Sequence, residues 1–239
     1  MLLRRINEHV TKQNWFAVGL DFLIVVFGVF IGLQVANWNE TRNDQAQEQL
    51  VIARLSDDFV ALSRDLDEKI AYLELANKGI EDMQKLIIDF PNAANQEHVR
   101  FFLEHSFKLE NPVGHSETYS QLVSSGDMNL ITNKTLRNTL MRHATLTNTL
   151  IQRDQARREW LRPYIMPLYR LLALNDTMPF RDAYNTAGSK ADLIVAIHIY
   201  KSVFRNQVGD LLEQKKSISK LNELLASKQN SKATGSNKN

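Results

Sequence analysis

Side chains that could carry chemistry are present, but their spacing fits no catalytic or metal-binding motif. The chain has six histidines and no cysteine, which excludes disulfides, thiolate zinc sites and a cysteine nucleophile. His98 and His105 are seven residues apart, too far along one expected helix to ligate one metal ion together. No HExxH pair, phosphate-binding loop, G-x-S-x-G elbow or GxGxxG fingerprint occurs. We therefore expect no catalytic residue, no cofactor and no metal; a composite metal site from several helices is the remaining alternative.

A cluster of basic and aromatic residues lies in the second half of the chain. It consists of four arginines and three aromatic residues, namely Arg153, Arg157, Arg158, Trp160, Arg162, Tyr164 and Tyr169. Such a cluster can bind an anionic ligand or phospholipid headgroups. The simpler interpretation, which we favour, is a solvated helix face that ends in interfacial packing.

Carboxylates and serine hydroxyls also have simple structural interpretations. Five carboxylates of the first long helix lie off its apolar positions, as on a solvated face, namely Asp57, Asp58, Asp65, Asp67 and Glu68. Ser124 and Ser125 precede Gly126, and a serine there could be a nucleophile. Ser-Ser-Gly is, however, typical of a helix C-terminus, where glycine takes the left-handed conformation.

The elements that position these residues begin with an apolar segment near the N-terminus. Residues 15–38 read WFAVGLDFLIVVFGVFIGLQVANW. At ~1.5 Å per residue, a helix between the two tryptophans spans about 33 Å, close to the hydrocarbon thickness of a bilayer. Trp15 and Trp38 stand where interfacial aromatic residues anchor membrane helices. The strictly apolar run, 22–33, is also short enough for a cleaved signal peptide or a buried core helix; we favour an uncleaved transmembrane anchor.

Flanking charges predict how the anchor is oriented. Three basic residues precede it and two follow between positions 37 and 56, namely Arg4, Arg5 and Lys12, then Arg42 and Arg54. Because basic residues favour the cytoplasmic side, we expect a bacterial inner-membrane protein with residues 1–14 in the cytoplasm. Residues 39–226 would then form a periplasmic domain. Residues 227–239 are polar and predict a disordered tail.

One face of the anchor collects its small and polar residues. At 100° per residue, Gly28 and Gly32 each lie about 20° from Asp21, and a GxxxG pair allows two helices to approach closely. A carboxylate inside a membrane is costly unless it is protonated or hydrogen-bonded. We expect Asp21, Gly28 and Gly32 to form an association face. The alternative is that Asp21 reaches the headgroups and the glycine spacing is chance.

A seven-residue apolar repeat follows the anchor. It runs through Ile52, Phe59, Leu66, Leu73, Ile80 and Ile87, with Leu55, Leu62, Ala76 and Met83 three residues further on. Lys69 interrupts the second row, and Ile70 can substitute there. The repeat predicts one long helix that continues from the anchor. It fits a coiled coil between chains and one helix of an antiparallel bundle equally well.

Further helices follow from caps and breakers. Pro91 should end the heptad helix, and short helices are expected over 95–109 and from Ser116 to Gly126. Leu130 and Ile131 then predict a buried connector. Asn133 is expected to cap a long helix that runs past Trp160.

The last part of the chain predicts one more long helix. Pro163 and Pro167 should kink or segment the helix that precedes it. Residues 175–190 read as a loop with one short helical turn. A final helix is expected over 191–225.

Two stretches carry motifs that go beyond periodicity. Residues 22–42 read FLIVVFGVFIGLQVANWNETR and residues 117–140 read ETYSQLVSSGDMNLITNKTLRNTL. They resemble a family of uncharacterised bacterial membrane proteins, a domain of unknown function, with an anchor ending in NWNE and a central TYxxLxxSG element. The resemblance implies a single-pass helical membrane protein and no activity. The central motif also has a purely structural interpretation. Tyr119 and Ser125 lie in a short helix that ends at Gly126, and a connector then leads to Asn133, which caps the next helix.

Composition agrees with these elements. Among 239 residues there are only 9 glycines and 5 prolines, and 44% are hydrophobic, which favours an all-α fold. The net charge of +2 gives no reason to expect nucleic acid as a partner. We expect one transmembrane helix that continues into an extramembrane helical bundle.

The expected function is a non-enzymatic interaction or scaffolding role at the bilayer. It would involve a homo-oligomer formed through the anchor or the heptad repeat, or an unknown protein partner. The alternatives are an extracytoplasmic ligand-sensing domain that acts through a partner and, less favoured, an enzyme whose site is built from several helices.

Overall fold

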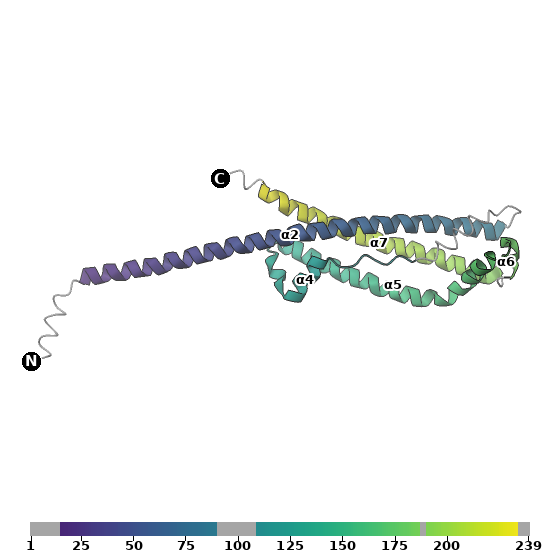
Figure 1. The fold of residues 1–239 in the computed structure, drawn as a ribbon, viewed down its shortest axis with the longest axis horizontal. Helices are drawn as coiled ribbons and strands as arrows, with labels where there is room; N and C mark the ends of the chain where they lie inside the picture. Colours follow the sequence, from purple (N-terminus) through teal and green to yellow (C-terminus); the bar gives the residue numbers. More distant parts are fainter. Residues whose placement is uncertain (1–14, 90–108, 187–189, 234–239) are drawn as a thin grey trace, which may run out of the picture. The chain divides into compact units, whose positions relative to one another are not determined.

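The computed structural model describes residues 15–89, 109–186 and 190–233 (Figure 1). Their elements are α2 (Trp15–Asp89), α4 (Glu117–Ser125), the 3-10 helix η1 (Asp127–Leu130), α5 (Lys134–Asn175), α6 (Phe180–Thr186) and α7 (Lys190–Ala233). No strand occurs within these ranges, so the expected all-α class is confirmed. The chain divides into two compact units, Met1–Leu50 and Val51–Asn239.

The heptad repeat of α2 is buried within the second unit. Five of its main positions are almost inaccessible to solvent, namely Ile52, Phe59, Leu66, Leu73 and Ile80. Ile70 is buried as well, as expected for the position where Lys69 breaks the companion row. Burial by the same chain means that the repeat forms an intramolecular core. The side chain of Ile87 lies outside the described residues.

Helices α5 and α7 lie side by side and run antiparallel (Figure 1). Contacting pairs show the direction, because residue numbers rise along α5 as they fall along α7: His143 with Ser217, and Asp154 with Gln207. Helix α2 is antiparallel to α7 by the same argument, since Asp67 pairs with Lys215 and Glu81 with Lys201.

Two helices extend further than the sequence predicted. Helix α5 is not segmented, and it contains both Pro163 and Pro167. The two prolines are four residues apart and therefore share one face. The carbonyl groups that lose a hydrogen bond belong to Glu159 and Pro163, which are exposed, so water can replace the missing donors.

Helix α7 likewise enters the segment expected to be a disordered tail. It extends to Ala233, because residues 227–233 contain neither glycine nor proline and continue from the buried turn at Leu225. The expected loop with one helical turn contains α6, which packs against α5. The expected stop at Pro91 and residues 95–108 of the next expected helix lie outside the described residues. Leu109, the last residue of that expected helix, is described and is not helical.

Candidate functional site

The proposed association face lies on the exposed part of α2 in the first unit. Asp21, Gly28 and Gly32 are all exposed, and a Cβ atom added at either glycine would meet nothing within 4 Å. Trp38 is also exposed and stacks with the Arg42 guanidinium, 5.1 Å from the ring centroid. Trp15 is the first residue of α2, and its side chain lies outside the description. The described residues thus leave this face of the helix uncovered.

The apolar residues around this face are exposed too. Every residue from 19 to 38 is exposed, and aromatic side chains such as Phe22, Phe27 and Phe30 have more than half of their surface accessible. Among the described helices, α2 alone contains a window long and apolar enough to cross a membrane, and none of that window is buried.

The central motif joins α4 to the heptad helix. Ser116 caps α4, because its hydroxyl accepts a hydrogen bond of 3.0 Å from the Tyr119 N–H. The same hydroxyl donates to Asp58 Oδ2 at 2.7 Å, and the Thr118 N–H donates to that oxygen at 2.9 Å. The sequence predicted that Asp58 lies on a solvated face, and this prediction is wrong. Asp58 instead holds the start of α4 against α2.

The pKa of Asp58 reports this contact. Burial raises the pKa, and the hydrogen bonds from Ser116 and Thr118 lower it; the net result lies below the ordinary value. A charged carboxylate at a helix N-terminus also interacts favourably with the helix dipole.

The C-terminal half of the motif consists of caps. Gly126 ends α4 with φ of 79°, the left-handed conformation expected of it, and Asn133 caps α5 by accepting a hydrogen bond of 3.0 Å from the Leu136 N–H. Ser124 and Ser125 donate to the carbonyl groups of Ser120 and Leu122 in their own helix. Leu122 is buried in this helix, whereas the neighbouring Val123 is exposed.

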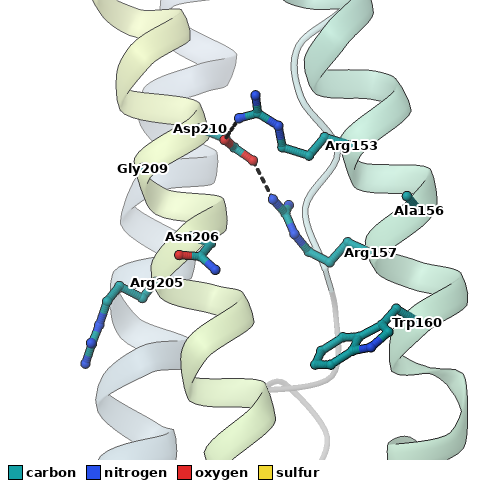
Figure 2. A pocket seen from close by; sticks show the side chains of 8 residues that line it. All are labelled: Arg153, Ala156, Arg157, Trp160, Arg205, Asn206, Gly209 and Asp210. Carbon is teal, nitrogen blue, oxygen red and sulfur yellow. Dashed lines mark hydrogen bonds and ion pairs between the residues drawn. The ribbon is translucent and has the colours of Figure 1, made fainter.

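The arginine cluster is not the solvated face that we favoured from the sequence. Asp210 of α7 accepts hydrogen bonds from Arg153 through Oδ1 and from Arg157 through Oδ2 (Figure 2). Asp154 is buried and pairs with Arg158 at 2.7 Å. Three of the four arginines are thus held by two aspartates inside or at the edge of the α5–α7 contact, whereas Arg162 pairs with the exposed Glu159.

A second polar group holds an extended segment, residues 109–116, against the helices. Gln214 accepts from the Val113 N–H at 3.2 Å and donates to the Val113 carbonyl at 2.9 Å, which is how a neighbouring β-strand would pair with that residue. Gln207 donates to the Glu110 carbonyl, and Arg158 donates to the Leu109 carbonyl at 2.9 Å. These bonds satisfy backbone groups that would otherwise be buried without a partner.

A pocket opens beside the ion pairs, between α5 and α7. Its volume is about 600 Å³. Figure 2 shows Arg153, Arg157 and Trp160 extending from α5, with Asp210 facing them from α7. Arg205 and Asn206 complete the α7 side, and the Arg205 guanidinium points away from Asp210 in this view. The sequence had indicated an anionic ligand as one alternative for this cluster.

The described histidines are engaged separately. His143 is buried, lies 3.0 Å from the Ser217 hydroxyl and contacts the Phe59 ring edge to face. Burial, with a smaller contribution from His115, lowers its pKa to about 4. His115 pairs with Asn148 at 2.9 Å. Within the described residues, no group of three or more potential ligands could hold a metal ion, and His9, His98 and His105 lie outside them.

The sequence did contain a signal for the buried polar groups that we missed. Core residues of α7 alternate in steps of three and four, and Gln207 and Gln214 occupy two positions of that series. His143 and Asp154 do the same in α5. A polar residue at an apolar register position predicts a buried hydrogen-bonded partner, because burial without one is costly.

Comparisons with family models, with curated proteins and with solved structures found no match.

Proposed function

We propose that this protein is a single-pass membrane protein whose helical domain acts by interaction or scaffolding and not by catalysis. One observation carries the proposal: an apolar stretch of α2, residues 19–38, is exposed on all sides. A buried core helix is covered by its own chain, whereas this one is not, and a bilayer is the environment that suits an apolar surface of about 30 Å.

The polar groups of the domain support interaction over catalysis. Asp210, Asp154 and Gln214 each bind other groups of the chain, so they stabilise the contacts between α5, α7 and residues 109–116. We propose that α2, α5 and α7 form an antiparallel bundle in which the heptad repeat is the α2 contribution to the core. The bias of basic residues toward the N-terminus then supports a bacterial inner-membrane protein with this bundle in the periplasm.

The orientation is tested by a reporter fused after Asn239, which is scored for periplasmic or cytoplasmic activity while the membrane fraction is assayed for the full-length chain. We expect periplasmic activity that stays with the membrane after alkaline extraction. Cytoplasmic activity would contradict the orientation. Release of a shortened chain into the soluble fraction would support the cleaved signal peptide instead.

Self-association through the anchor is the first interaction to test, because the heptad repeat is already used within one chain. We expect that crosslinking in membranes gives a dimer or higher oligomer and that Gly28→Ile and Gly32→Ile reduce it. A Cβ atom added at either position meets nothing within 4 Å in the described part of the chain, so a loss of crosslinking indicates a contact with a neighbouring molecule.

Gly19→Ile is the matched control for this crosslinking experiment. Gly19 is equally open and lies on another face of the same helix. Equal effects of all three substitutions, or a monomer in the unsubstituted protein, would contradict the association face.

A further inference from the structure

We propose that the pocket between α5 and α7 binds a small organic anion. Its carboxylate or phosphate group would meet the arginines, and its planar or apolar part would lie on Trp160. The pocket is formed wholly by residues 153–210 of the second unit, so the proposal does not depend on the membrane anchor.

The shape of the pocket suits a small molecule. Its volume of about 600 Å³ falls within the usual range for small-molecule sites, roughly 300–1,000 Å³. Short residues provide the space, because Ala156 and Gly209 lie on facing helices. A Cβ atom at Gly209 would meet nothing within 4 Å, so this side of α7 is open and not filled by a neighbouring side chain.

The charges that line the pocket do not cancel. Three arginines, Arg153, Arg157 and Arg205, and one carboxylate, Asp210, line the pocket, which leaves an excess of two positive charges among the lining residues. Each oxygen of Asp210 already accepts from one arginine. Asp210 therefore holds Arg153 and Arg157 in place, and a guanidinium has five N–H donors, so donors remain for a ligand.

Two of these arginines are accessible. The side chain of Arg153 is 51% exposed although it is paired. Arg205 is exposed and forms no ion pair within the described part of the chain. An exposed arginine side chain changes rotamer on a fast timescale, so Arg205 can turn from the position in Figure 2 toward an anion at the rim.

Trp160 supplies the surface for the apolar part of the ligand. Its side chain is 53% exposed and extends toward α7 below Arg157 in Figure 2. The ring of Tyr164 supports it, with 5.5 Å between the ring centroids. An indole held next to a guanidinium offers both a stacking face and a charge, which is a common way to bind an aromatic or otherwise planar anion.

Binding is measured on the full chain in neutral detergent, with Trp15→Phe and Trp38→Phe introduced so that Trp160 is the sole tryptophan. Phenyl phosphate and benzoate are the probes, benzyl alcohol is the uncharged analogue and inorganic phosphate the anion without a ring. We expect a saturable change in Trp160 fluorescence with phenyl phosphate or benzoate, a weaker response to inorganic phosphate and none to benzyl alcohol.

Two matched pairs of substitutions test the site itself. Gly209→Leu should abolish binding by filling the pocket, whereas Gly209→Ala should leave it unchanged. Arg205→Gln should raise the Kd about tenfold through the loss of one charged hydrogen bond. Arg142→Gln, an exposed arginine of α5 outside the pocket, should have no effect. All three positions are exposed on helices, and retained helicity by circular dichroism shows that each of the four variants folds.

The source of the anion is distinguished by repeating the titration in nanodiscs. Competition by phosphatidylglycerol nanodiscs and not by phosphatidylcholine nanodiscs identifies a lipid headgroup; binding that is equal in both identifies a soluble anion. The proposal is overturned if no anionic probe gives a saturable signal at millimolar concentration. It is equally overturned if Gly209→Leu and Arg205→Gln bind as tightly as their controls.

Discussion

At the scale of single residues, we expect substitution of Asp210 to destabilise the domain, because its one carboxylate pairs with two arginines. The side chain of Arg157 is only 10% exposed, and its second counter-charge, Asp154 at 3.6 Å, is shared with Arg158. Removal of the Asp210 charge therefore leaves a largely buried cation with only this shared carboxylate. We expect Asp210→Asn to lower the free energy of unfolding by about 3 kcal/mol, measured by urea unfolding of the full chain in neutral detergent.

Glu159→Gln is the control for Asp210. Its carboxylate pairs with Arg162 at 3.8 Å, but both side chains are exposed, and exposed pairs contribute less than about 1 kcal/mol. Equal effects of the two substitutions would mean that the Asp210 pairs do not stabilise the α5–α7 contact.

His143 gives the domain a defined dependence on pH. Burial, followed by the proximity of His115, lowers its folded pKa from 6.5 to about 4. The unfolded chain therefore binds a proton in a pH range where the folded chain does not. Stability is full above pH 6.5 and falls as the pH drops toward 4, by a total of about 3 kcal/mol. Urea unfolding at several pH values measures this slope.

The same titration on His143→Gln isolates the contribution of the histidine. Ser217, Thr147 and Phe59 surround the ring from three helices, and glutamine keeps a polar partner for Ser217. We expect a flatter profile between pH 6.5 and pH 5, above the range of Asp58, whose lowered pKa acts at more acidic pH. An unchanged slope would show that His143 is not the titrating group.

At the scale of elements, the end of α4 depends on the conformation of Gly126. Its φ of 79° is costly for residues with a Cβ atom, and no neighbour lies within 4 Å of that position, so the cost is conformational and not steric. We expect Gly126→Ala to lower the free energy of unfolding by about 1–2 kcal/mol and Gly126→Asn to cost less.

Gly114→Ala is the matched control for Gly126, because it is equally open but has no positive φ. We expect its effect to stay within about 0.5 kcal/mol. A loss at Gly114 as large as that at Gly126 would contradict the C-cap assignment.

The heptad repeat predicts which leucines of α2 contribute to stability. Leu73 is fully buried, whereas Leu75, two residues away on the same helix, is 56% exposed. We expect Leu73→Ala to cost about 2–5 kcal/mol and Leu75→Ala less than about 0.5 kcal/mol. Because the core is intramolecular, the unfolding midpoint should not change with protein concentration. A midpoint that rises with concentration would favour a coiled coil between chains.

The elements could be predicted to different degrees. Local signals sufficed for the caps at Ser116 and Asn133, since a side chain bonds to a backbone group three residues away. Helix continuity through Pro163 and Pro167 could not be predicted, because it depends on whether their face is exposed. The seven-residue repeat predicted which face of α2 is buried, but it could not predict which helix packs against that face.

At the scale of the whole molecule, the all-helical class followed from composition and periodicity, whereas the polar contacts of the core did not. Asp154 and Asp210 are 56 positions apart and share the arginine cluster only because α5 and α7 run antiparallel. The pocket arises from the same pairing. Long-range pairing of this kind is a property of the packed chain and leaves only an indirect trace in the sequence, a polar residue in an apolar register.

The central claim is that residues 15–38 cross a membrane, and the absence of cysteine from the chain allows a direct measurement. Single substitutions Phe27→Cys and Leu75→Cys are made in the full chain, both at exposed positions of α2, and intact cells with a permeable outer membrane are treated with a membrane-impermeant maleimide. We expect Leu75→Cys to react and Phe27→Cys to react only after detergent dissolves the bilayer. Equal labelling of both without detergent would contradict the account.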